Sequence, residues 1–99
     1  GADRPSARHL PAAGGGYAVV ELMEEPPESQ HYWDAEDIAC GDVLVRLFLL
    51  FRDQMEVGEV LHLRSINEAI HIDLYAWCGL TGNSLLYADA PHYYLRKVG

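Results

Sequence analysis

The chain has 99 residues, of which 49% are apolar and 22% charged, a composition typical of one small globular domain rather than a disordered chain. Its 15 acidic residues outnumber the 7 basic ones and give a formal net charge of −8, which argues against nucleic acid or an anionic membrane surface as a direct partner. No apolar run reaches the roughly 18 residues that a membrane span requires, and the N-terminus lacks the pattern of a signal peptide. The sequence therefore predicts a soluble, cytoplasmic protein with protein partners.

The first 30 residues carry weak structural signals. Residues 1–16 are rich in Pro, Ala and Gly, which is typical of a flexible segment. Residues 17–22, YAVVEL, have strand composition, but the Pro pair of MEEPPESQ ends any strand that begins there. Residues 1–30 are therefore expected to be a flexible N-terminal extension, with either one extra strand or a stray apolar patch at 17–22.

From residue 31 onward, strand and helix signals alternate. Asp42 suits the first turn of a helix and Gly82 the exit of another, while VLHLR has the alternation of a half-buried strand. The expected elements are strands at 31–34, 60–64, 84–89 and 92–98 and helices at 41–55 and 67–80. This order predicts an α+β fold, a two-layer α/β sandwich in which two helices cover one face of a mixed four-stranded sheet.

Two cysteines, Cys40 and Cys78, are too few for a disulfide framework, and in a reducing compartment both are expected to be free thiols. Neither they nor the histidines have the spacing of a zinc site, so no metal and no cofactor is expected. Cys78 follows Trp77 in the middle of the second predicted helix, where a packed thiol is expected. Cys40 precedes the first helix, where either a reactive thiol or a small packed residue would fit.

Residues 31–61, HYWDAEDIACGDVLVRLFLLFRDQMEVGEVL, resemble the opening of the TusA/SirA-like sulfur-carrier family. That opening runs from a strand and an Asp to a Cys-Pro-x-Pro motif, a helix and a Pro-Gly-Glu turn, and Asp34, Cys40, Gly58 and Glu59 match it. IDLYAWCGLTGNSLLYAD is similar to the family's second helix and its exit, and HYYLRKV to its last strand. The resemblance covers residues 31–99 and implies one TusA/SirA-like domain there.

The resemblance implies that Cys40 is the catalytic residue of a sulfurtransferase of the persulfide-carrier type. It would accept sulfane sulfur from a donor such as a cysteine desulfurase and pass it to an acceptor protein. Cys40-Gly41-Asp42-Val43 stands where the family has Cys-Pro-x-Pro, so both prolines are missing. The backbone at Gly41 and Asp42 would stabilise the thiolate, but the flexible glycine and the nearby carboxylate predict a less activated cysteine than the family has.

A second interpretation is a non-catalytic interaction module of the same fold. The first helix is apolar almost all round, although a two-layer fold buries only one of its faces. Val45, Phe48, Leu49 and Phe51 are then candidate interface residues for a homodimer or another partner, unless the YAVVEL segment covers them. A third interpretation, a redox sensor using both cysteines, requires Cys78 to be accessible.

Overall fold

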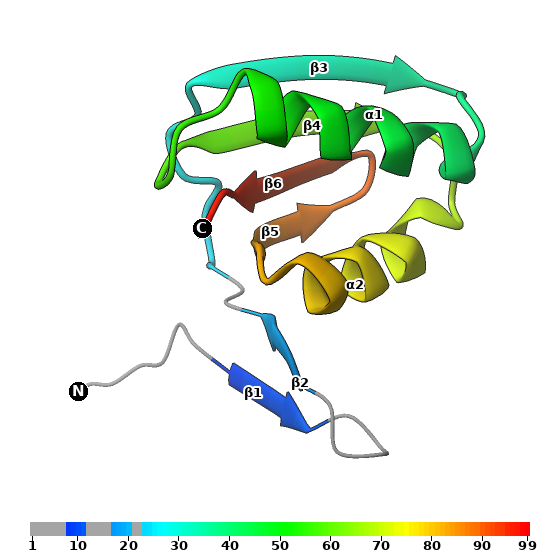
Figure 1. Cartoon of the computed structure of the whole chain (residues 1–99). Coiled ribbons are helices and arrows are strands. Elements are labelled where there is room, and N and C mark those ends of the chain that lie inside the picture. Colours follow the sequence, from blue (N-terminus) through cyan, green and yellow to red (C-terminus); the bar gives the residue numbers. More distant parts are fainter. Residues whose placement is uncertain (1–7, 12–16, 21–22) are drawn as a thin grey trace.

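A mixed β-sheet with two helices packed on one face makes up the structure (Figure 1). The computed structural model describes residues 8–11, 17–20 and 23–99. Its elements in chain order are β1 (Arg8–Pro11), β2 (Tyr17–Val20), β3 (His31–Glu36), α1 (Cys40–Asp53), β4 (Val60–Ser65), α2 (Ile70–Thr81), β5 (Ser84–Asp89) and β6 (His92–Arg96). From residue 31 onward this is the predicted order of strands and helices.

The strand order in the sheet is β1-β2-β5-β6-β4-β3. Strand β3 is parallel to β4, because α1 connects them as a crossover, whereas β6 is antiparallel to both β4 and β5. The predicted α+β, two-layer class is therefore confirmed, and the four predicted strands are β3 to β6. The sheet has two strands more than predicted, since β2 lies beside β5 and β1 pairs with β2.

The two additional strands fall in the predicted N-terminal extension. Strand β2 lies within residues 17–22, where an extra strand was one of two expectations. Strand β1 was not expected, because RHLP is only four residues long, ends in a proline and has no apolar alternation. The other residues of the segment 1–16 lie outside the described residues.

One core joins both helices to the sheet. Val43, Leu47 and Phe51 recur every four residues along α1 and are buried, so they form the stripe that faces the sheet. The other core residues are Ala35, Met55, Leu61, Leu63, Ile70, Leu74, Trp77, Cys78, Leu85, Tyr93 and Leu95. Burial of each large apolar side chain stabilises the fold by roughly 1.5–3 kcal/mol. The helices can therefore leave the sheet face only at a large cost.

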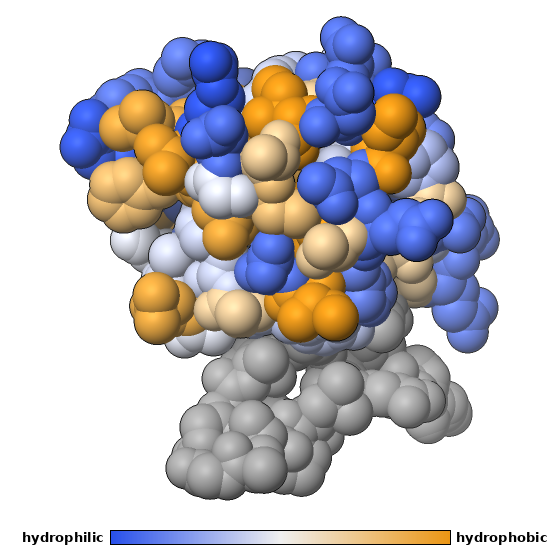
Figure 2. All heavy atoms as spheres, turned by 90° about the vertical axis from the view of Figure 1, so that its right-hand side faces the viewer, coloured by the Kyte–Doolittle hydropathy of each residue, from blue (hydrophilic) through white to orange (hydrophobic). Residues whose placement is uncertain are grey.

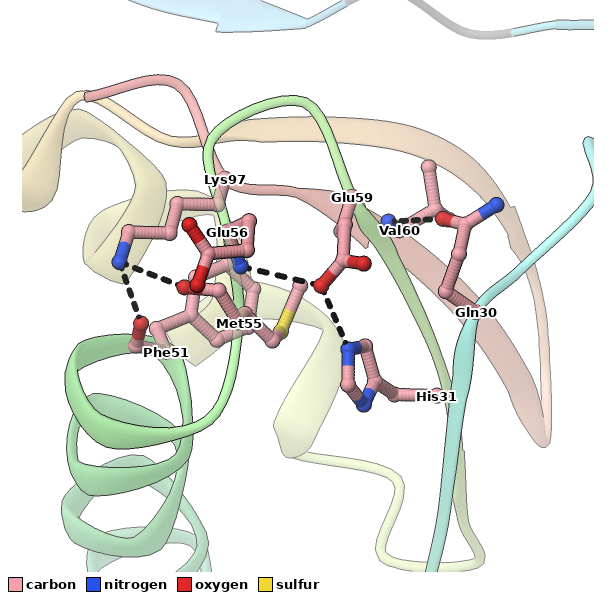
Figure 3. Close-up of polar contacts among 8 residues, drawn as sticks. All are labelled: Gln30, His31, Phe51, Met55, Glu56, Glu59, Val60 and Lys97. Carbon is pink, nitrogen blue, oxygen red and sulfur yellow. Dashed lines mark hydrogen bonds and ion pairs between the residues drawn. The ribbon is translucent and has the colours of Figure 1, made fainter.

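Polar contacts fix the end of α1 against the strands that follow it (Figure 3). The Lys97 ammonium donates hydrogen bonds to the carbonyl oxygen of Phe51 in the last turn of α1 (2.7 Å) and to that of Met55 just after the helix (2.8 Å). Beyond the turn, a Glu59 carboxylate oxygen lies 2.7 Å from Nε2 of His31 and so connects the starts of β3 and β4. These contacts hold the C-terminal end of α1, and its N-terminal end therefore has a fixed place at the opposite end of the sheet.

Helix α2 begins at Ile70, three residues later than predicted. The side chain of Asn67 accepts a hydrogen bond from the backbone N–H of Ala69 (3.1 Å), which makes residues 67–69 a turn instead of a helical start. The helix ends as expected at Gly82, whose φ of 82° is readily adopted only by glycine.

Candidate functional site

Cys40 is the first residue of α1 and follows an irregular turn at the end of β3. Oδ1 of Asp34 accepts a hydrogen bond from the backbone N–H of Glu36 (3.0 Å), whose φ is 53°, and both carboxylate oxygens of Asp34 accept from Nη1 of Arg64 (3.0 and 3.1 Å). The regular pairing of β3 with β4 is therefore interrupted next to the contact between Asp34 and Arg64. The aspartate that matches the family pattern has a structural role here, since it sets the direction in which the chain approaches Cys40.

The N-terminal end of α1 presents free backbone donors near the thiol. The residue before the helix is Ala39, which offers no side-chain acceptor, and the first helical bond runs from Val43 N–H to the Ala39 carbonyl (3.0 Å). Gly41 and Asp42 lie exposed in the first turn, as predicted. A Cβ atom at Gly41 would meet nothing within 4 Å, so the surroundings do not require glycine there.

The Cys40 thiol is half-buried, and its pKa is raised above the ordinary value. Burial is the largest cause, followed by a hydrogen bond to the Asp73 carboxylate and by the charge of that carboxylate, while the backbone N–H of Cys40 itself acts in the opposite direction. The expected direction is therefore found, but the carboxylate responsible comes from the first turn of α2 rather than from Asp42. Sequence reasoning missed Asp73 because Cys40 and Asp73 belong to two different helices and lie 33 positions apart along the chain.

Cys78 is inaccessible. Its exposed fraction is 2%, it belongs to the core between α2 and the sheet, and burial raises the pKa of its thiol to about 12. Both thiols are free. A redox sensor that uses both cysteines therefore has no support, because Cys78 is neither exposed nor ionised at neutral pH.

The four residues expected to form an interface on α1 differ in their exposure. Val45, Phe48 and Leu49 are 59%, 51% and 41% exposed, but Phe51 is only 4% exposed and packs edge-to-face on Trp77 with ring centroids 4.9 Å apart. Phe51 therefore packs with the buried residues of α1, and of the expected interface residues it is the least exposed. The described part of YAVVEL pairs beside β5 and so does not cover α1.

A groove of about 700 Å³ lies between α1 and the C-terminal half of α2. Its apolar lining includes the exposed Val45 and Phe48 of α1 together with Trp77 and Leu80 of α2, and Leu80 is 88% exposed. An apolar surface of this kind is a common feature of protein-binding sites. Cys40 does not line the groove, although Leu44, one helical turn after it, does.

The sheet face opposite the helices carries a row of aromatic rings. Tyr32, His62, Tyr94 and Tyr87 are direct cross-strand neighbours, one from each of β3, β4, β6 and β5. The rings of His62 and Tyr94 are stacked at 4.3 Å, and Nε2 of His62 lies 2.9 Å from Nδ1 of His92. Within the described ranges, no three His, Cys, Asp or Glu side chains gather as a metal site would require. These histidines therefore belong to the packing of the row.

Figure 2 shows the end of the molecule at which both helices begin. Apolar patches there are separated by hydrophilic residues, and no single apolar area covers this end. A partner that reaches Cys40 from this end therefore meets a surface on which hydrophilic and hydrophobic residues alternate.

No protein-family model matches the chain, and no curated protein matches it. The described residues contain no helix of the length and apolarity needed to cross a bilayer. The likeness to the TusA/SirA-like family therefore rests on the residues of this chain alone.

Proposed function

We propose that this protein carries sulfane sulfur as a persulfide on Cys40, in a relay between a protein donor such as a cysteine desulfurase and an acceptor protein in the cytoplasm. One observation supports the proposal above the others: Cys40 is a partly exposed thiol at the first residue of α1, where the backbone N–H of Cys40 acts against the rise in its pKa that burial and Asp73 cause. The chain's other thiol is buried in the core, so only Cys40 can meet a partner.

The transfer consists of two exchange steps of the same kind. The Cys40 thiolate attacks the terminal sulfur of the donor's persulfide, the S–S bond of the donor breaks, and the donor leaves as a thiolate. An acceptor thiolate then attacks the terminal sulfur on Cys40, and the Cys40 thiolate leaves. No net oxidation occurs, and the sulfur atom only changes its carrier.

The Asp73 carboxylate acts on the Cys40 thiol from the first turn of α2. Burial is the largest cause of the raised pKa of Cys40, and the hydrogen bond to this carboxylate and its charge raise that pKa further. The thiol is therefore kept protonated in the resting protein and is expected to react slowly with small electrophiles. A bound donor is expected to speed the transfer because it places its persulfide next to Cys40.

Intact-mass measurement after incubation with a cysteine desulfurase and cysteine tests the proposal. Wild-type protein and Cys78→Ala are expected to gain one sulfur mass that a thiol reductant removes, whereas Cys40→Ser is expected to gain none. Alanine is chosen at position 78 because a serine hydroxyl would be buried there without a partner. An adduct that persists in Cys40→Ser, or that depends on Cys78, would contradict the proposal.

The second candidate function is a non-catalytic interaction module. The groove between α1 and α2 favours it, because Val45, Phe48 and Leu80 remain exposed along its walls. The absence of both motif prolines is also consistent with a fold that has lost the transfer activity. If wild-type protein gains no sulfur under conditions that load a Pro-containing family member, the interaction module becomes the better account.

A further inference from the structure

Strand β3 forms an open edge of the sheet. It pairs with β4 on one side, and no other described strand lies on its second side. The irregularity between Asp34 and Glu36 ends regular pairing, so the usable edge comprises residues 31–34. An unpaired edge of this kind is a template for a further strand.

The backbone of β3 is suited to pairing with its own copy. His31 lies opposite Leu61 in the parallel register, and the backbone groups of Glu59 and Ser65, at the two ends of β4, bond toward β6. By alternation, His31 and Trp33 bond to β4, while the backbone groups of Tyr32 and Asp34 point away from it. Two outward-pointing residues on either side of one position can exchange hydrogen bonds with each other's copies across a twofold axis at that position. Trp33 lies between Tyr32 and Asp34 and fits that position.

Above this edge, α1 carries a stripe that ends in opposite charges. A hollow of about 240 Å³ is lined by Trp33 and Gln54 and by four α1 residues, Arg46, Leu49, Leu50 and Asp53. The four are spaced i, i+3, i+4 and i+7 and therefore lie along one side of the helix. The stripe begins with a cation, has two leucines in its middle and ends with an anion, and Leu49 is 41% exposed.

We propose that a second copy of this chain occupies this surface, with β3 paired antiparallel to its own copy and the α1 helices packed antiparallel above it. Arg46 of each copy then faces Asp53 of the other, and Leu49 meets its counterpart near the twofold axis. Asp53 already accepts two hydrogen bonds from Arg52 (2.8 and 3.1 Å), but a carboxylate has further lone pairs available for a second guanidinium.

When two copies of the stripe meet in opposite directions, the cation of each faces the anion of the other. The groove between α1 and α2 has no such self-complementarity. The charged residues that line the groove are Arg52 and Lys97, so two grooves that face each other bring like charges together. The net charge of −8 also opposes association in general, but at 0.1 M salt this repulsion is screened beyond about 10 Å. The contact between the two stripes is short-ranged and favourable. This inference does not depend on the proposed sulfur transfer.

Sedimentation equilibrium between about 1 and 300 μM protein tests the dimer. Wild-type protein is expected to associate to a dimer in this range. Arg46→Asp alone and Asp53→Arg alone place like charges opposite each other and are expected to raise the dissociation constant at least about tenfold. The double variant restores opposite charges and is expected to return it to within about threefold of the wild-type value. Circular dichroism confirms that each variant is folded.

A matched pair of leucine variants distinguishes this interface from the groove. Leu49→Lys is expected to give monomers, whereas Leu80→Lys, which changes a more exposed leucine of the groove, is expected to leave the dimer intact. Three results would each overturn the inference: a wild-type monomer over the whole range, dissociation by Leu80→Lys instead of Leu49→Lys, or no recovery in the charge-exchanged double variant. Cys40→Ser is expected to remain dimeric, so failure of the sulfur assay leaves this test intact.

Discussion

The surroundings of Cys40 and Cys78 differ in a way that decides what each thiol can do. Both thiols have a raised pKa, but burial alone acts on Cys78, while burial and the Asp73 carboxylate act together on Cys40. A buried thiol can ionise only if the core opens. A half-buried thiol next to a carboxylate can be changed by one substitution or by a docked partner. A raised thiol pKa can therefore belong either to a cysteine that is inert because it is buried or to an accessible cysteine whose ionisation is disfavoured by a nearby carboxylate.

The largest expected effect is the difference in alkylation rate between the two cysteines. In the folded protein at pH 8, iodoacetamide is expected to modify Cys40 at least about 1,000-fold faster than Cys78, because Cys78 must wait for an opening of the core. Time-resolved intact mass with peptide mapping measures both rates. In concentrated urea the two rates should converge, and similar rates in the native protein would remove the distinction.

Substitution of Asp73 tests how much this carboxylate contributes to the raised pKa of Cys40. Asp73→Asn removes the charge and the carboxylate acceptor that raise the pKa of Cys40, so the pKa is expected to fall. The thiolate fraction near pH 7.5 then rises, and alkylation should become about three- to tenfold faster, with its pH midpoint moved to lower pH. Asp42→Asn is the matched control, since Asp42 is also in a first turn but is not among the causes of the shift. Equal effects of both variants would contradict the role given to Asp73.

The smallest effect concerns the missing proline. Gly41 lies in the first turn of α1, where a Cβ atom would meet nothing within 4 Å beyond the chain neighbours and where a proline removes no helical hydrogen bond. It is expected to stabilise the fold by about 0.4–1 kcal/mol, because it reduces the conformational entropy of the unfolded chain. Thermal or urea unfolding measures the change. A loss of stability would mean that the first turn needs the Gly41 N–H.

Most of the fold from residue 31 onward was predictable, because its signals are local. Val43, Leu47 and Phe51 show the helical period of α1, Leu61 and Leu63 show the alternation of β4, and Gly82 marks the end of α2. Strand β1 has no such signal, since its four residues depend on pairing with β2. Asn67 delayed the start of α2 through a side-chain contact that propensity does not reveal.

The candidate site was predictable only in part. The matches at Asp34, Cys40 and Glu59 located the thiol, but the Asp73 contact joins α1 to α2, and nothing in the local sequence of either helix indicates it. The row of aromatic rings was missed for the same reason, because Tyr32, His62 and the other rings become neighbours only when four strands pair in one register. The sequence pattern predicts the helices and strands themselves, but it does not predict the contacts between them.

The measurement that tests the central claim most directly is the location of the sulfur after loading. The protein is incubated with a cysteine desulfurase and cysteine, free persulfides are blocked with an alkylating reagent, and the peptides are mapped by mass spectrometry. The account predicts the added sulfur on the peptide that contains Cys40, followed by its loss when an acceptor thiol is supplied. Sulfur on Cys78, or none on either cysteine while the desulfurase is active, would contradict it.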